Sequence, residues 1–155
     1  MIISRMYPVV FGSLVLLVVS AVAQEKNIKR SDLPPAVEKT VSAQSQGATV
    51  HGFTREKENG QTFYEAEMTV NGLSRDILID PTGAIVEVEA QVALPSLAEG
   101  IKDGLQTKAG KGKIVKVESI TKHDKLVAYE AQVVTGGKKS EVQVGPDGKA
   151  LDHEE

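Results

Sequence analysis

Three histidines are the side chains of this 155-residue sequence best suited to acid–base or metal chemistry. His51 follows Val50 in an apolar–polar alternation, His123 stands beside Asp124 in a predicted hairpin tip, and His153 precedes two glutamates. A nucleophilic enzyme needs a base beside its nucleophile, and a metal site needs several ligands together. We therefore interpret each histidine as a solvated surface residue, with weak metal binding at His153 as the minor alternative.

Two other short segments, residues 80–83 and 108–113, resemble functional motifs but differ from them at required positions. Residues 80–83, Asp-Pro-Thr-Gly, look like an aspartic-protease loop, but Pro81 interrupts that motif, and the similar run 145–148 begins with glycine. The basic run 108–113 lacks the glycine spacing of a phosphate-binding loop and its Ser or Thr after lysine. We predict a turn and a solvated loop, the loop being a secondary candidate for contact with an acidic partner. The sequence predicts neither an enzyme nor a cofactor or metal site.

The first 23 residues predict export. A basic start with Arg5 precedes an apolar run from Val9 to Val19, and the small residues up to Ala23 form a cleavage pattern typical of a signal peptide. The apolar run is shorter than the roughly 20 residues that span a membrane. We expect cleavage after Ala23, a periplasmic or secreted location and no stable membrane insertion. An uncleaved N-terminal anchor is the alternative.

Composition limits the partners. Without residues 1–23, 132 residues remain, and their 17 basic and 21 acidic side chains give a formal charge of −4. Nucleic acids and anionic membranes favour a clustered basic face, so we expect neither. The chain has no cysteine, which excludes a lipoprotein and leaves stability to packing alone. Residues 24–30 are polar and predict a mobile leader.

An internal similarity organises the remaining chain. Tyr-Glu-Ala-Glu at 64–67 recurs 65 residues later as Tyr-Glu-Ala-Gln at 129–132. Other matches are Leu33-Pro34 with Leu94-Pro95, and Ile77, Ile79, Pro81 and Gly83 with Val142, Val144, Pro146 and Gly148. We predict two repeats, over 31–92 and 93–152, followed by a tail, 153–155. Chance similarity of two strand-rich segments is the alternative.

Each predicted repeat begins with a helix. Ser31 and Asp32 are the expected cap of the first helix, because Pro34 and Pro35 are tolerated only in a first turn. Apolar residues spaced by four form one stripe on each helix: Leu33, Val37 and Val41, then Leu97, Ile101 and Leu105. Gly100 and Gly104 weaken the second helix, so docking on a sheet must stabilise it.

The rest of each repeat predicts a strand meander. Strands are expected near 48–57, 61–70, 73–79 and 84–90, and near 113–122, 126–134, 138–144 and 149–151, separated by turn residues such as Asn71-Gly72. β-Bulges near Gly52 and Ser119 would bring Val50, Phe53, Val117 and Ile120 to the core. Alternation places one set of side chains beneath the helices: Tyr64, Ala66, Met68, Val70, Ile77, Ile79, Tyr129, Ala131, Val133, Val142 and Val144. We predict an α+β fold with two helices on one face of an antiparallel sheet of about eight strands.

The order Leu-Pro, short helix, hairpin, Tyr-Glu-Ala and Asp-Pro-x-Gly resembles the PepSY domain, in particular the exported PepSY-like group related to β-lactamase-inhibitory protein. The resemblance covers both predicted repeats. It implies a helix-plus-sheet unit, an envelope location and binding or inhibition of proteins such as peptidases, with no catalytic residue. The chain lacks the cysteines of the secreted β-lactamase inhibitors, which argues against a β-lactamase target.

The sheet face opposite the helices is the predicted binding surface. Alternation places on it Phe63, Glu65, Glu67, Asp76 and Leu78, then Ala128, Glu130, Gln132, Val134 and Glu141. We predict that Phe63, Glu65, Glu67, Asp76, Leu78, Glu130 and Gln132 bind a protein or peptide of the cell envelope. A face that simply meets water is the alternative. The function we expect is a non-catalytic exported binding module that restrains a peptidase or another envelope enzyme. The alternative is a structural or ligand-sensing scaffold that self-associates through this face.

Overall fold

The computed structural model describes residues 25–58, 60–153 and 155. The predicted signal peptide, residues 1–23, lies outside them. Within the described residues, neither helix has the length and hydropathy needed to cross a membrane.

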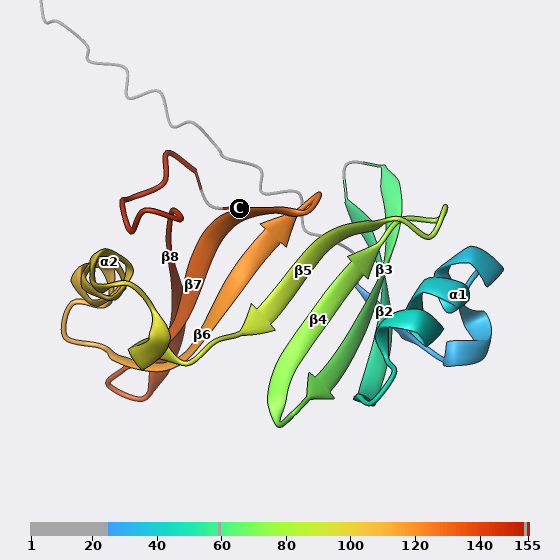
Figure 1. Cartoon of the computed structure of the whole chain (residues 1–155), viewed down its shortest axis with the longest axis horizontal. Coiled ribbons are helices and arrows are strands. Elements are labelled where there is room, and N and C mark those ends of the chain that lie inside the picture. The colour runs from blue at the N-terminus through green and yellow to red at the C-terminus, as the bar shows by residue number, and fades with distance from the viewer. Residues whose placement is uncertain (1–24, 59, 154) are drawn as a thin grey trace, which may run out of the picture.

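Eight strands form one antiparallel sheet in which neighbours in sequence are neighbours in space (Figure 1). They are β1 (Lys26–Ile28), β2 (Thr49–Glu58), β3 (Gln61–Val70), β4 (Leu73–Ile79), β5 (Ile85–Gln91), β6 (Lys113–Lys122), β7 (Lys125–Thr135) and β8 (Lys138–Val144). Helix α1 (Pro35–Gln44) joins β1 to β2, and α2 (Glu99–Ala109) joins β5 to β6. Short 3-10 turns, Arg30–Asp32 and Leu94–Ser96, precede the helices. The predicted α+β class and antiparallel sheet are confirmed.

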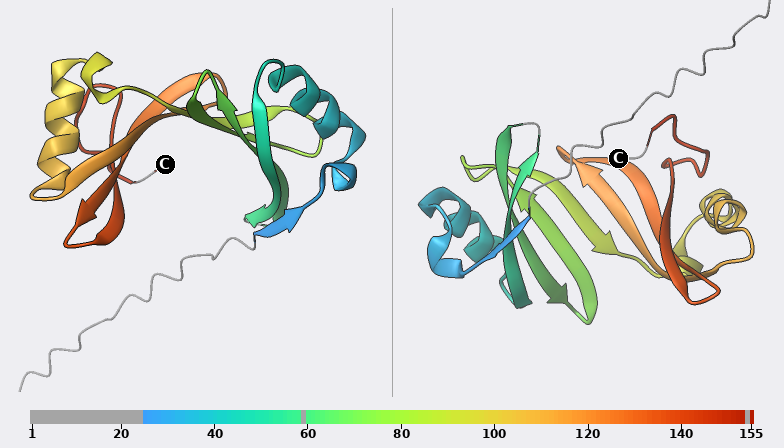
Figure 2. Two further views of the ribbon diagram at one scale, coloured as in Figure 1. Left: turned by 90° about the horizontal axis from the view of Figure 1, so that it is seen from below. Right: turned by 180° about the vertical axis from the view of Figure 1, so that it is seen from behind.

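Cross-strand pairing shows that both helices cover the same face. Ala66 pairs with Ile77, and Ile77 pairs with Val88, so these side chains of β3, β4 and β5 lie on one face. Ala90 pairs with Ser119, and Ser119 with Tyr129, which carries it to β7. Directly paired residues point to the same side of a sheet. Figure 2 shows the sheet as an arch with a helix outside each end, so its inner face stays open.

Two apolar clusters hold the helices in place. Val37 and Val41 of α1 are fully buried with Ala66, Met68, Ile77 and Ile79. Ile101 and Leu105 of α2 are buried with Val117, Ala131, Val133 and Val144. Tyr64, Val70, Tyr129 and Val142 pack against these clusters, so all the residues that the alternation placed beneath the helices lie there. Because both clusters lie on the helix-covered face, the inner face of the sheet is free to carry polar side chains.

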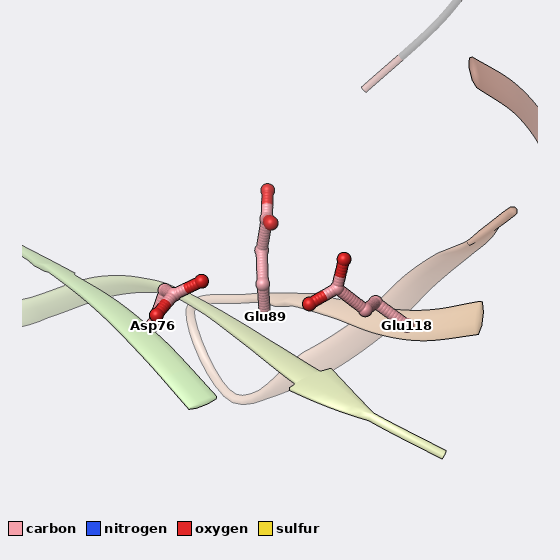
Figure 3. A group of neighbouring side chains, drawn as sticks. All are labelled: Asp76, Glu89 and Glu118. Atoms are coloured by element: carbon pink, nitrogen blue, oxygen red, sulfur yellow. The ribbon is translucent and has the colours of Figure 1, made fainter. Parts of the chain in front are cut away.

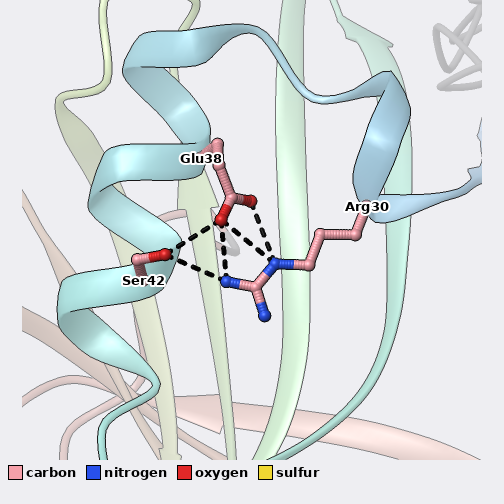
Figure 4. A network of polar contacts seen from close by, with 3 residues as sticks. All are labelled: Arg30, Glu38 and Ser42. Atoms are coloured by element: carbon pink, nitrogen blue, oxygen red, sulfur yellow. Dashed lines mark hydrogen bonds and ion pairs between the residues drawn. The ribbon is translucent and has the colours of Figure 1, made fainter.

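Part of the segment expected as a mobile leader, residues 24–30, belongs to the fold instead. Lys26–Ile28 pairs with residues 53–55 of β2, and Ile28 packs against the first cluster. The Arg30 guanidinium binds the Glu38 carboxylate at 2.8 Å and the Ser42 hydroxyl at 3.0 Å, which fixes the chain against α1 (Figure 4). A three-residue strand with one apolar side chain is too short to produce a recognisable alternation.

Three further expectations need correction. Residues 149–151 are not a strand. The eighth strand of the sheet is instead β1, at the opposite edge. Ser31 and Asp32 do not cap α1: the Asp32 carboxylate accepts the Lys29 amide at 3.0 Å, and α1 begins after Pro34. Helix α2 continues to Ala109, so the predicted loop 108–113 shortens to residues 110–112.

The expected β-bulge near Gly52 is present; the irregularity nearest Ser119 falls after Ile120, so it does not bring Ile120 to the core. The sheet register shifts between Val50 and Gly52, and both Val50 and Phe53 pack on the first cluster. In β6 the shifts fall between residues 114 and 116 and between 120 and 121. Ile120 is therefore buried, at 1% exposure, on the open face rather than beneath α2.

The turn after β8 lies against α2 so closely that glycine is required there. A Cβ at Gly104 would overlap the carbonyl oxygen of Gly148, which itself has a φ of +80°. At Gly100, one turn earlier on the same helix, a Cβ would lie 3.6 Å from the Asp147 carbonyl oxygen, an ordinary contact.

We predict that Gly104→Ala destabilises the protein by about 1–3 kcal/mol, because backbone atoms must move to admit the methyl group. Gly100→Ala is the matched control and should stabilise by up to about 1 kcal/mol through helix propensity. Urea denaturation followed by circular dichroism measures both. Equal stability of the two variants would show that the contact between α2 and this turn does not require glycine.

Candidate protein-binding site

The open face is built from rows of residues paired across the strands. One row contains three consecutive acids: Glu67 of β3 pairs with Asp76 of β4, and Asp76 pairs with Glu89 of β5. Ile120 of β6 continues this row. The adjacent rows contain Thr54, Glu65, Leu78, Glu87 and Lys122 on one side, and Gln91, Glu118, Glu130 and Gln143 on the other.

Three carboxyl groups meet near the centre of this face. Oxygens of Asp76, Glu89 and Glu118 lie within 4.8 Å of one another, and Figure 3 shows the side chains rising from neighbouring strands on the same side. Like charges directly opposite each other destabilise a sheet. The Lys116 ammonium, 2.7 Å from Glu118, compensates part of this repulsion.

We do not assign a metal to this group. Calcium takes six to eight oxygen ligands, whereas only three carboxyl side chains of the described residues meet here. The Ser74 hydroxyl donates to Glu118 at 3.2 Å, and the Lys116 ammonium already supplies a cation beside it. The arrangement is better described as a crowded carboxyl cluster within the sheet face.

Crowding and burial keep protons on this face. Burial, followed by the charges of Glu87, Glu130, Glu118 and Asp76, raises the pKa of Glu89 to about 8. The pKa of Glu65 also rises, to about 7, mainly through burial; a hydrogen bond from the Thr54 hydroxyl at 2.8 Å opposes the rise.

The neighbouring acids follow the same trend. Burial raises the pKa of Glu56 and that of Asp76, and nearby carboxylates add to both shifts. Near neutral pH the face therefore carries bound protons and is less negative than its composition implies.

Two hollows lie side by side on this face. A groove of about 580 Å³ is lined by Phe63, Leu78 and Val86 and by polar side chains at the adjoining turns. A second hollow, of about 270 Å³, is lined by Leu78 and seven carboxyl groups: Glu25, Glu56, Glu58, Glu65, Asp76, Glu87 and Glu89. Both hollows include Glu58, Leu78 and Glu87, so a groove with mixed apolar and polar walls opens directly into an acidic one.

Glu155 occupies the other half of the open face. Its backbone amide donates to the Gln143 side-chain oxygen at 2.8 Å, and its carboxylate lies 3.4 Å from the Lys122 ammonium. Gln143 in turn donates to the Glu130 carboxylate at 2.8 Å. Accessible surface is therefore concentrated over β3–β5 and the adjoining edge of β6.

The structure separates the predicted binding residues into two groups. Phe63 and Leu78 line the groove, Glu65 and Asp76 line the acidic hollow, and Glu67 stands exposed beside Asp76. The other two are on β7, away from both hollows: Glu130 contacts Gln143, and Gln132 pairs with Lys116 and Glu141.

Six acids of the site were missing from the predicted set: Glu25, Glu56, Glu58, Glu87, Glu89 and Glu118. Glu87 and Glu89 alternate with Val86 and Val88, a pattern that could have placed them on the open face. Glu118 could not be placed that way, because its strand contains the displaced bulges.

The residues considered for catalysis have other contacts. The His51 ring lies 2.7 Å from the Thr69 hydroxyl, the exposed His123 borders the groove, and His153 is 3.9 Å from the Glu155 carboxylate. In the turn 80–83, the Asp80 carboxylate accepts the Thr82 hydroxyl at 2.6 Å and amides of the turn. These bonds lower the pKa of Asp80 and fix the turn, as the sequence predicted.

Comparison with known proteins identifies the fold. No known protein family and no curated protein matches the sequence. A protein described as periplasmic from Bacteroides eggerthii has a TM-score of 0.61 and 15% identity, over 77% of this chain and 86% of that one. A BLIP-like protein from Bacteroides fragilis has a TM-score of 0.56 and 14% identity, over 77% and 83%. A DUF2874 family protein from Bacteroides ovatus has a TM-score of 0.59 and 19% identity, over 78% and 86%.

These identities establish similarity of fold. The likeness to a BLIP-like protein agrees with that part of the predicted resemblance, and the names of the neighbours agree with the predicted periplasmic location. The PepSY assignment and the two tandem repeats remain predictions.

We predict that stability falls as the pH rises. The pKa of Glu89 is about 8 in the fold, against an ordinary value of 4.5. Stabilisation from the bound proton is complete below pH 4.5 and is lost as the pH rises to about 8. Glu89→Gln keeps a neutral side chain and should stabilise the protein at pH 8.5 by about 1–2 kcal/mol after allowance for solvent screening, with little effect at pH 5.

Urea denaturation at the two pH values measures this difference. Glu141→Gln is the control, because Glu141 is exposed on the edge strand β8 and lies outside both hollows. If Glu89→Gln has the same effect at both pH values, the fold does not hold the proton.

Proposed function

We propose that the chain is a non-catalytic periplasmic binding module that holds a protein or peptide segment on the open face over β3–β6. One observation carries the proposal: a groove that contains Phe63, Leu78 and Val86 opens into a hollow lined by seven carboxyl groups and, among the described residues, by no lysine or arginine. The signal-peptide pattern and the periplasmic names of the structural neighbours support the location. Restraint of an envelope enzyme such as a peptidase is the form of binding implied by the resemblance to inhibitory proteins.

The two hollows favour a partner with two kinds of side chain. Burying an apolar side chain against Phe63 and Leu78 removes apolar surface from water, which supplies affinity. An adjacent lysine or arginine would face the carboxyls of Glu65 and Glu89, which supplies orientation and speeds encounter. The partner segment is therefore basic, with at least one apolar anchor.

Charge argues against the alternative of a scaffold that self-associates through this face. In a symmetric dimer the same patch meets itself. The acidic row of Glu67, Asp76 and Glu89 would then approach a second acidic surface, and juxtaposed like charges oppose association.

We predict that Phe63→Ala weakens partner capture by at least about 2 kcal/mol, roughly thirtyfold, because Phe63 is the largest apolar side chain of the groove. Phe63 belongs to neither apolar cluster, so the fold should be retained. Leu73→Ala is the matched control: Leu73 is 43% exposed, but it lies on the helix-covered side of β4.

Tagged variants incubated with envelope extract, followed by affinity measurement on the recovered partner, test this prediction. Equal recovery by wild type, Phe63→Ala and Leu73→Ala would place binding elsewhere. Concentration-dependent sedimentation of the purified protein without a recovered partner would favour the self-associating scaffold.

A further inference from the structure

Glu89 stands at the centre of the open face, and acids approach it from each neighbouring strand. Asp76 lies opposite on β4, Glu87 precedes it on β5, Glu118 approaches from β6, and Glu130 lies beyond on β7. Glu118 already has the Lys116 ammonium at 2.7 Å. A second lysine of this face, Lys122, lies 3.8 Å from Glu87 and 3.4 Å from Glu155.

Glu65 is in a similar position nearer the first edge of the sheet. Glu56 faces it from β2, Glu67 follows it on β3, and Asp76 lies on β4. The Thr54 hydroxyl donates a hydrogen bond to its carboxylate at 2.8 Å. Both glutamates line the acidic hollow, and among the described residues no lysine or arginine lines it. A partner's cation is therefore the group that can neutralise the two carboxylates once they ionise.

We propose that partner binding at this face is coupled to proton release: a lysine or arginine side chain entering the acidic hollow replaces protons held by Glu65 and Glu89. The coupling rests on the proposed function, since it describes regulation of the same face. The partner would be held near neutral pH and released as the surroundings acidify.

The sign of the coupling follows from the charges. Burial and like charges hold protons on Glu89 and Glu65 in the free protein, with pKa values of about 8 and about 7. A nearby cation favours the ionised carboxylate and lowers both pKa values. By linkage, each proton released on binding makes the association constant rise up to about tenfold per pH unit. Carboxyl groups with ordinary pKa values are already ionised above pH 5.5, so they would change the association constant little with pH.

An arginine-containing probe isolates this effect, because arginine stays charged throughout the pH range. We suggest an acetylated, amidated peptide with leucine and arginine two residues apart, so that both side chains point to the same side of an extended chain. Isothermal titration calorimetry at pH 5.5, 6.5 and 7.5, in buffers of different ionisation enthalpy, measures affinity and the number of protons released.

We predict that the association constant for this peptide rises about tenfold or more from pH 5.5 to 7.5, with about one proton released at pH 7. Glu89→Gln and, as a second variant, Glu65→Gln should each reduce the pH dependence and the proton count. Glu141→Gln should leave both unchanged. Histidine titrates in the same range, so each measurement is repeated in His123→Asn, in which asparagine suits the positive φ of +48°.

The possible failures are distinguishable. Binding with a pH-independent affinity and no proton release would overturn the coupling and leave the docking face intact. No binding of the peptide even at pH 7.5 and low salt would overturn the docking face, and the coupling with it. Loss of the pH dependence in His123→Asn alone would assign the released proton to the histidine and reject the role of the two glutamates.

Discussion

The open face depends on one constraint: sheet pairing forces Glu67, Asp76 and Glu89 into direct opposition on three adjacent strands. Glu118 joins Asp76 and Glu89 from the next strand, with carboxyl oxygens of the three within 4.8 Å of one another. Two features reduce the repulsion among these acids. The Lys116 ammonium lies 2.7 Å from Glu118, and Glu89, whose pKa is about 8, retains its proton near neutral pH. A surface of this kind is stabilised by any cation that reaches it, which is why the same constraint that costs stability favours a basic partner.

The rest of the fold makes this surface available. Both apolar clusters lie on the face beneath α1 and α2, at the two ends of the arch. The core therefore makes little demand on the opposite face, whose side chains include the acids of β3–β5 as well as Phe63, Leu78 and Ile120. Glu155 covers part of β6–β8, and the groove and the acidic hollow therefore meet over the first five strands and the edge of β6.

The regular spacing of apolar residues along the chain predicted most of this fold. The alternation in β3 and β4 placed Ala66, Met68, Ile77 and Ile79 correctly beneath a helix, and glycine turns located the hairpins. Strand β1 was missed because it contains three residues, and Ile120 was placed on the wrong face because bulge positions depend on tertiary packing. The predicted site included Glu65 and Asp76 but omitted Glu89, although its alternation with Val88 could have placed it on the open face. Glu118 could not be placed in this way, because its strand contains the displaced bulges and pairs with β5 only after the intervening helix folds back.

The most direct test of the account is a carbon-13 NMR titration of the side-chain carboxyl groups in the free protein. The account requires Glu89 to titrate with a midpoint near 8 and Glu65 near 7, while isolated surface glutamates titrate in the ordinary range. That result would show that the open face stores protons before any partner arrives. Titration of both glutamates near pH 4.5 would show a fully ionised face at neutral pH, and would contradict both the crowding described here and the coupling built on it.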